Sequence, residues 1–419
     1  MLGSEAFRET HRVKPSDFTR KRSLPLPVVV GFLLQLCGGV ALQGALDAFF
    51  CDLRQRSRFV REVTKSAFCQ ARQKLHASAF AALNHWWVEH WHLEGAFERW
   101  CGLRVVAVDG TCLRLPRWGE NVDAYGRGPC GDGSVVMARC VALFSTATRQ
   151  VLDITVGRYD ASERELLVGS LGAVKAGDSG DVLVLDRGYP AWWLFAALQA
   201  KGVAFCARIE GCSWPQVARF MACTQSQLVI ERTVDRATRS KLAALGLQAK
   251  SLVRLRLVKV VLPNGYLEVL ATSLLDDARY PGAMFGALYR SRWGIEEAFK
   301  TLKHRLNLEG FSGELPQAIE QEIHAKALMY NITQALCSEA TERLSPTQMG
   351  VCQVNHAYAL KHAARLVVCW LRGAGRALAE MVEAVVTALA NTLERRRPDR
   401  SFPRNHRYGG ALRPRKNYR

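Results

Sequence analysis

The sequence has no Cys-x-x-Cys pair, and its 13 cysteines are an odd number scattered along 419 residues. Such spacing makes a poor disulfide framework and a poor zinc site, and it fits a reducing cytoplasm. The polar first eleven residues do not have the pattern of a secretory signal peptide. We therefore expect a cytoplasmic protein whose chemistry depends on neither disulfides nor zinc.

The sequence also lacks a clean apolar run of the ~20 residues that a membrane-spanning helix needs. Its most apolar stretch, residues 24–50, is interrupted by prolines, glycines, glutamines and one aspartate. We interpret this stretch as one or two buried helices and expect no membrane association. A membrane anchor is the alternative interpretation.

Acidic residues are few, at 38 against 57 lysines and arginines, which gives a net charge of +19. A surplus of that size favours a polyanionic partner, either nucleic acid or an anionic membrane. The last 25 residues, 395–419, hold ten of the cations and one acid, with Phe402, Tyr408 and Tyr418 between them. This basic tail fits an arm that binds a nucleic-acid backbone, and it fits a solvated end equally well.

Hydrophobic periodicity predicts a mixed α/β protein. Residues 1–100 have helical patterns, and residues 101–209 have short apolar strands followed by alternating strands and helices. Strands with charged faces follow over 210–285, and helices return after them. In the first segment, a helix over 64–75 carries Lys65, Arg72 and Lys74. These cations suit a helix laid against DNA, although an ordinary solvated face is the simpler interpretation.

Two strand-end acids are the first candidates for chemistry. Asp109 and Asp186 each follow a short apolar strand and stand next to, or close to, a glycine. Either acid alone fits a turn residue. Buried carboxylates are costly unless they are paired or bind a cation, and an oxygen-only site is what Mg²⁺ and Mn²⁺ prefer.

The stretch 288–306 contains no proline and is predicted to form one amphipathic helix. At about 100° per residue, Tyr289, Arg292, Glu296 and Lys303 share one narrow face beside a stripe of apolar residues. This places a carboxylate between hydrogen-bond donors and cations, a face that suits a metal-bound phosphodiester. The alternative is a surface helix stabilised by pairs such as Glu296–Lys300.

Three motifs together resemble a known family. They are Asp109-Gly110-Thr111, the run Asp-Arg-Gly-Tyr at 186–189, and the pattern Tyr289-x2-Arg292-x3-Glu296-x6-Lys303. The chain resembles the DDE transposases of bacterial insertion sequences, specifically the insertion-sequence-four family. The last pattern is specific and the first two are weak alone. The resemblance extends over nearly the whole chain.

The resemblance implies a ribonuclease H-like mixed-sheet core interrupted by a β-rich insertion. The expected domains are a helical N-terminal DNA-binding region (1–100), the first part of the catalytic core (101–209), the insertion (210–285), the second part of the core with the Glu-bearing helix (286–345), a helical C-terminal region (346–394) and the basic tail (395–419).

The resemblance also implies the site. Asp109, Asp186 and Glu296 would be the catalytic residues and would hold two Mg²⁺ ions, or Mn²⁺. Tyr289, Arg292 and Lys303 would hold phosphates of the DNA. The further DNA-binding candidates are Lys300, Arg187 and Tyr189. An aromatic residue in the insertion would stack on a flipped base, for which Trp214 is the candidate, although packing is its simpler role.

The function implied is cut-and-paste transposition, in which metal-dependent cleavage at the element ends, through hairpin ends, precedes strand transfer to target DNA. The partners would be double-stranded DNA, as terminal inverted repeats and target, and a second copy of the chain in a homodimer. No small-molecule substrate is expected, and the location would be the bacterial cytoplasm at the nucleoid. The alternative is a DNA-binding protein of the same fold without current activity.

Overall fold

The computed structural model describes residues 1–20, 22–36, 41–58, 60–95, 97–129, 135–211, 214–262, 265–373 and 375–396. All but the first two residues of the basic tail, including Phe402, Tyr408 and Tyr418, therefore lie outside the described residues. The chain divides into two compact units. The first comprises Met1–His90, Cys112–Ala138 and Lys300–Arg419, and the second comprises Trp91–Thr111 and Arg139–Phe299.

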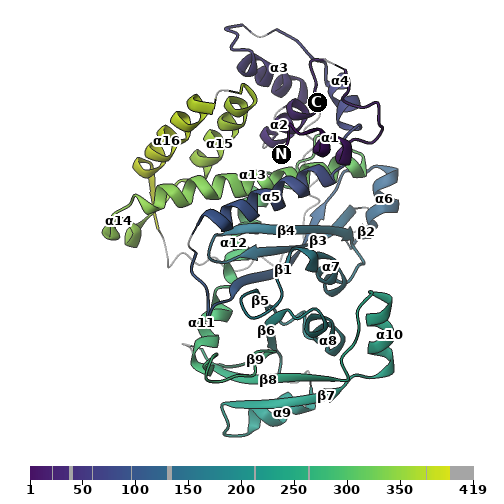
Figure 1. Cartoon of the computed structure of the whole chain (residues 1–419), viewed down its shortest axis with the longest axis vertical. Coiled ribbons are helices and arrows are strands. Elements are labelled where there is room, and N and C mark those ends of the chain that lie inside the picture. Colours follow the sequence, from purple (N-terminus) through teal and green to yellow (C-terminus); the bar gives the residue numbers. More distant parts are fainter. Residues whose placement is uncertain are drawn as a thin grey trace. The chain divides into compact units, whose positions relative to one another are not determined.

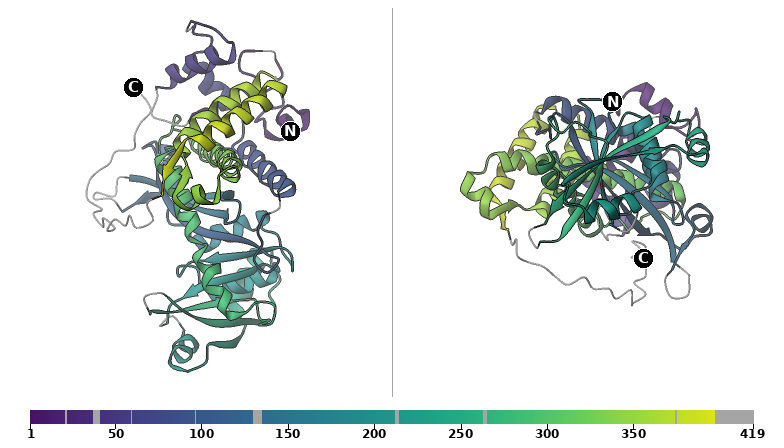
Figure 2. Two further views of the ribbon diagram at one scale, coloured as in Figure 1. Left: turned by 90° about the vertical axis from the view of Figure 1, so that its left-hand side faces the viewer. Right: turned by 90° about the horizontal axis from the view of Figure 1, so that it is seen from below.

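The second unit is built on a mixed sheet (Figure 1). Its strands lie in the order β4-β3-β1-β5-β6-β9-β8-β7, and Figure 2 shows them fanned out in the view from below, as the twist of a sheet requires. They are β1 (Arg104–Arg114), β3 (Val135–Ser145), β4 (Gln150–Arg158), β5 (Asp181–Leu185), β6 (Ala204–Ile209), β7 (Gln227–Thr233), β8 (Leu252–Val261) and β9 (Leu267–Thr272).

Strand direction changes in the middle of this sheet. β1, β5 and β6 run parallel to one another, whereas β9, β8 and β7 are joined by antiparallel pairing that starts from β6. The three strands predicted for the insertion are thus present, and they extend the same sheet. All five residues of β5 are buried, as expected for a central parallel strand covered on both faces.

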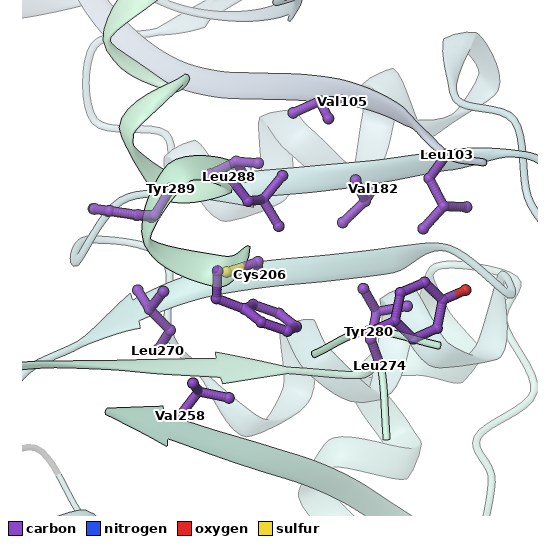
Figure 3. Close-up of a cluster of buried hydrophobic side chains, with 12 residues drawn as sticks. Leu103, Val105, Val182, Cys206, Val258, Leu270, Leu274, Tyr280, Leu288 and Tyr289 are labelled. Atoms are coloured by element: carbon purple, nitrogen blue, oxygen red, sulfur yellow. The ribbon is translucent and has the colours of Figure 1, made fainter. Parts of the chain in front are cut away.

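The core of this unit joins the sheet to the helix that follows the insertion. Leu103, Val182 and Leu270 from the sheet region pack with Leu288 and Tyr289 in one cluster of buried side chains (Figure 3). Burying such side chains contributes about 1.5–3 kcal/mol each. The cluster therefore fixes the start of the Glu-bearing segment against the strands.

The helices of this unit lie between its strands in sequence or follow the last strand. They are α7 (Glu163–Gly169), continued by a 3-10 turn at Ser170–Ala173, then α8 (Trp192–Ala200), α9 (Pro215–Ala222), α10 (Arg236–Ala244), α11 (Phe285–Arg290) and the start of α12 (Trp293–His304). The sequence analysis missed α9 and α10. Both carry local signals: Pro215 begins α9, and the Asp235 side chain caps α10 by accepting from the Thr238 amide.

The single helix predicted over 288–306 is wrong, because α11 ends at Arg290 and α12 begins at Trp293. The amides of Gly294 and Ile295 bond to carbonyls three residues back, and the Ser291 hydroxyl bonds to the Leu288 carbonyl at 2.7 Å. These bonds compete with the helical ladder at the junction. Tyr289 therefore does not follow the angular spacing of α12.

The first unit is mainly helical. Its helices are α1 (Glu5–His11), α2 (Leu26–Gln35), α3 (Leu42–Leu53), α4 (Lys65–Arg72), most of α5 (Ser78–Glu94), α6 (Gly119–Tyr125), the end of α12, α13 (Pro316–Glu342), α14 (Pro346–Val351), α15 (His356–Leu371) and α16 (Gly375–Asn391). Short strands are β2 (Arg127–Gly128), which pairs with the start of β3, and the pair β10 (Cys352–Val354) and β11 (Leu393–Arg395).

The long helix α13 organises this unit by packing against α2, α15 and α16. Figures 1 and 2 both show α15 and α16 side by side. They are separate helices because Gly373, at φ +72°, ends the first one. The apolar stretch 24–50 forms two helices, α2 and α3, as predicted. Among the described residues, no helix is both long and apolar enough to cross a bilayer.

The prediction that Arg72 lies on an exposed, DNA-facing side of its helix is wrong. Arg72 is 2 % exposed and donates to Gln321 at 3.0 Å, Glu322 at 3.0 Å and Ser312 at 2.9 Å. Lys326 lies 3.7 Å from the second oxygen of Glu322. A buried carboxylate with these partners joins α4 to α13, so Arg72 is a structural residue.

The observed architecture confirms the predicted mixed α/β class with helical regions toward both ends. The domain boundaries given above remain predictions.

Candidate active site

The register of two parallel strands aligns the first two predicted acids. Ala107 of β1 pairs with Val184 of β5, and continuing the same register by two residues brings Asp109 level with Asp186. Neighbouring strands lie about 4.8 Å apart, and residues level with each other in a parallel pair point to the same side. Asp186 directly follows β5, whereas β1 runs on to Arg114, so Asp109 is not at a strand end as predicted.

A buried ion pair fixes this register five residues earlier. Arg104 donates from Nε and Nη2 to the two carboxylate oxygens of Asp181, both at 2.7 Å. Asp181 also accepts from the Lys175 amide at 2.8 Å. A bidentate pair of this geometry permits one alignment of the two strands. The alignment of Asp109 with Asp186 follows from it.

Arg292 connects the third acid to the first. Its Nη2 donates to Glu296 Oε1 at 2.8 Å, and its Nη1 lies 3.8 Å from Asp109 Oδ2. The Arg292 side chain is 8 % exposed, and those of Asp109 and Glu296 are 20 % and 23 % exposed. The carboxylates of Asp109 and Glu296 thus meet around one guanidinium, at the break between α11 and α12.

Electrostatics at Asp109 show that the three acids act on one another. The pKa of Asp109 is raised to about 6. Burial is the largest cause, Arg292 and a hydrogen bond from the Gly110 amide lower the pKa, and the charges of Asp186 and Glu296 raise it. A carboxyl with a raised pKa beside a cluster of charges is characteristic of functional sites.

The donor set has the chemistry of a divalent-cation site but not its spacing. The three side chains offer only carboxylate oxygens, the ligands that Mg²⁺ and Mn²⁺ prefer. Within the ranges that the structure describes, however, no three histidine, cysteine, aspartate or glutamate side chains are close enough to hold an ion. In this arrangement Arg292 supplies the positive charge between Asp109 and Glu296.

The other predicted site residues differ in their burial and in the groups that they contact. Tyr289 is buried in the core cluster, where burial raises its pKa to about 12. Lys303 donates from Nζ to the Cys112 carbonyl at 3.0 Å, and Lys300 is exposed. Arg187 is 64 % exposed and pairs with Glu210 at 3.0 Å. Tyr189 is buried, and burial raises its pKa well above the usual value.

The aromatic candidate of the insertion is a packing residue in this structure. The Trp214 ring stacks on Trp192 with centroids 4.2 Å apart, and Phe195 packs edge-on against it. The aromatic side chain that is exposed near the acids is Trp293, at 54 %, with the Arg292 guanidinium 5.5 Å from its ring centroid. A tryptophan beside Arg292 is visible in the sequence, but its exposure is not.

Two residues at the start of α7 were missed. The carboxylate of Glu163 lies against Gly110, so close that a Cβ on that glycine would stand 2.3 Å from Glu163 Cδ. Burial raises the pKa of Glu163, which also pairs with Arg139 at 3.4 Å. Arg164 donates to the carbonyls of Gly188 and Tyr189. An acid and an arginine at a helix start are common, so no sequence signal marks them.

Comparison with known proteins shows the family of the chain. The family model described as "Transposase DDE domain" matches residues 100–332, and the chain belongs to that family. Its class is therefore that of enzymes that cleave DNA strands and transfer them, and the class implies the use of divalent metal ions. The matched range contains Asp109, Asp186 and Glu296.

One curated relative is the transposase of an insertion sequence. The transposase InsG of insertion sequence element IS4 from Escherichia coli K12 is 26 % identical over 338 residues, which cover 78 % of this chain and 72 % of the relative. Among solved structures, the piggyBac transposase synaptic complex with hairpin DNA aligns over 91 % of this chain and 80 % of its own, at 10 % identity and a TM-score of 0.43. The resemblance to DDE transposases and the enzyme class are confirmed. The predicted mixed sheet is confirmed by the strand order, and its ribonuclease H-like character stays a prediction.

Proposed function

We propose that Asp109, Asp186 and Glu296 are the catalytic residues of this transposase and together bind its divalent ions. The observation that carries the proposal is the strand register that sets Asp109 beside Asp186, with Arg292 linking Asp109 to Glu296. Two ions bound there, Mg²⁺ or Mn²⁺, would supply an activated water and stabilise the leaving oxygen of a DNA strand.

Arg292 has two roles in this proposal. Without DNA its guanidinium compensates the carboxylates of Asp109 and Glu296, which would otherwise repel each other in a half-buried site. When DNA binds, a phosphate competes for the same guanidinium, and Arg292 turns toward the backbone. The acids are then free to hold cations. In this proposal the three carboxylates have the ligand chemistry of a cation site but come close enough to bind ions only after Arg292 has moved.

The other cations named for the site bind DNA. Lys303 and the exposed cations Lys300 and Arg187 contact phosphates, and Tyr289 and Tyr189 support the site from within the core. Trp293 offers an exposed ring on which an unpaired base can stack, worth about 1–3 kcal/mol per base. Trp293→Ala should therefore weaken binding of an end with one unpaired base more than Trp293→Phe does, and equal affinities would exclude this role.

The proposed reaction is cut-and-paste mobilisation of an insertion sequence. Cleavage at the terminal inverted repeats frees a 3′ hydroxyl, which attacks the opposite strand to give a hairpin. After the hairpin is opened, the hydroxyl attacks target DNA. We propose that two copies of the chain hold the two ends as a homodimer, in the bacterial cytoplasm at the nucleoid.

The test is cleavage of a duplex that carries the inverted repeat flanking the gene. Asp109→Asn, Asp186→Asn and Glu296→Gln should each abolish cleavage without lowering DNA affinity, because only the chemical step needs the acids. Asp160→Asn, at a surface acid paired with Arg158, is the matched control. Hairpin ends should appear on denaturing gels. Binding without cleavage by the natural chain would favour the alternative of an inactive DNA-binding protein.

A further inference from the structure

The segment after β5 is held by an arginine that precedes it by more than twenty residues. Arg164, the second residue of α7, donates from Nη2 to the Gly188 carbonyl at 2.7 Å and from Nε to the Tyr189 carbonyl at 3.0 Å. Its guanidinium thus fixes two successive carbonyls of the turn that begins at Asp186. Both bonds are charge-assisted and stronger than ordinary backbone bonds.

The same turn is bonded to the Asp186 side chain. The Gly188 amide donates to Asp186 Oδ1 at 2.8 Å, so Gly188 is bonded through its N–H to the carboxylate and through its carbonyl to Arg164. A Cβ on Gly188 would stand 3.1 Å from Asp186 Oδ1, which makes the approach tight for any other residue. The direction of the Asp186 carboxylate therefore depends on a turn that Arg164 fixes.

The residue before Arg164 contacts the other strand. Glu163 packs its carboxylate on Gly110, the residue after Asp109, and pairs with Arg139 of β3. Two consecutive side chains at the start of α7 thus contact the backbone beside each of the two aligned aspartates. The arrangement links α7 to the geometry of the Asp109–Asp186 pair.

We propose that Arg164 is a positioning residue, which orients the Asp186 carboxylate by fixing the 186–189 turn. The inference rests on the proposed function, in which Asp186 is catalytic. Removing a group that orients a catalytic carboxylate through hydrogen bonds lowers activity by about 10–100-fold. Arg164 itself contacts neither DNA nor reacting atoms in this proposal.

The test uses Arg164→Met, which keeps the aliphatic stem but removes both donors, and Arg164→Lys, which keeps a charge. Two quantities are measured in the full-length chain: the maximal cleavage rate at saturating DNA end, and amide hydrogen exchange of the peptide covering 184–192. Arg164→Met should lower the maximal rate by about 10–100-fold with the Michaelis constant for DNA unchanged, and should raise exchange at the Gly188 amide at least about tenfold. Arg164→Lys should be intermediate in both.

Arg158→Met is the matched control, because Arg158 is an exposed arginine of the same unit that bonds Asp160. The proposal is overturned if Arg164→Met has the cleavage rate and the amide exchange of the wild type. It is also overturned if amide exchange rises in Arg164→Met while the cleavage rate stays at the wild-type value. Where Arg164→Met fails to fold, Arg164→Lys decides by the same two readouts. Asp186→Asn separates the two proposals. Cleavage by that variant contradicts the proposed function, whereas its inactivity beside a fully active Arg164→Met contradicts only the positioning role.

Discussion

Arg292 donates a 2.8 Å hydrogen bond to Glu296, four residues further along the chain, and the same guanidinium reaches Asp109 at 3.8 Å. The arginine of the motif thus contacts two acids of the proposed catalytic set. This contact explains how two half-buried carboxylates remain close together. It also makes the charge of Arg292 a determinant of the titration of Asp109.

Replacing Arg292 should shift the pH dependence of cleavage. The guanidinium lowers the pKa of Asp109 against the effect of burial. In Arg292→Gln that pKa rises further above about 6, so the acidic limb of the pH profile of kcat/KM, which reports the free enzyme, should move to higher pH. Arg292→Lys should shift it less. Rate profiles from pH 5.5 to 8.5 measure the effect, and superimposable limbs for wild type and Arg292→Gln would contradict it.

Neutralising Asp109 should stabilise the metal-free protein above pH 6. Its folded-state pKa is about 6 against a usual 3.8, so ionisation costs folding free energy. That cost is absent below pH 3.8, where the carboxyl is protonated in both states, grows between 3.8 and about 6, and is complete above it. Asp109→Asn should therefore raise the free energy of unfolding at pH 7.5 by at most about 3 kcal/mol.

Urea unfolding in the presence of a chelator measures that gain, and repeating it at pH 5 provides the internal control. The gain should be smaller at pH 5 than at pH 7.5. A loss of stability at pH 7.5, or a gain that grows toward low pH, would show that Asp109 is not held in the unfavourable environment described here.

Replacing only one residue of the Arg104–Asp181 pair should lower the free energy of unfolding. Either Arg104→Met or Asp181→Leu leaves one buried charge without a partner, which costs about 3–5 kcal/mol of unfolding free energy. The double variant removes both charges and should recover most of that loss. Because the pair also fixes the register of Asp109 and Asp186, cleavage by the folded double variant should stay reduced. Full activity in it would mean that the register is set elsewhere.

Lys303 should contribute one phosphate contact. In the structure its ammonium bonds the Cys112 carbonyl at 3.0 Å, which holds it at the end of α12. Lys303→Gln should lower affinity for DNA and reduce the slope of log affinity against log salt by about one. Binding measured from 50 to 200 mM salt tests this. A weaker affinity at an unchanged slope would instead indicate that Lys303 only supports the local structure.

The sequence analysis identified the acids but not what holds them. Apolar strands followed by an aspartate were enough to select Asp109 and Asp186, because strand patterns are local. The offset that aligns them depends on the Arg104–Asp181 pair, which joins residues 77 positions apart. The contact of Arg164 with the 186–189 turn joins residues 24 and 25 positions apart. Neither contact produces a periodic pattern in the sequence.

The helix predicted from angular spacing was wrong at the position where a side chain competes with the backbone hydrogen bonds. The Ser291 hydroxyl and the three-residue bonds after it divide the expected helix, which a wheel calculated over 288–306 cannot anticipate. Arg72 was misplaced for a different reason. Its carboxylate partner, Glu322, lies 250 residues away, and without that partner an arginine on a helix is expected to face solvent.

The most direct test of the account is a crystal structure of the chain with its DNA end and Mn²⁺, with the ions located from their anomalous signal. The account predicts signal between the carboxylates of Asp109, Asp186 and Glu296, with Arg292 turned from Glu296 to a DNA phosphate. Manganese bound elsewhere, with Arg292 still paired to Glu296 beside the scissile strand, would contradict it.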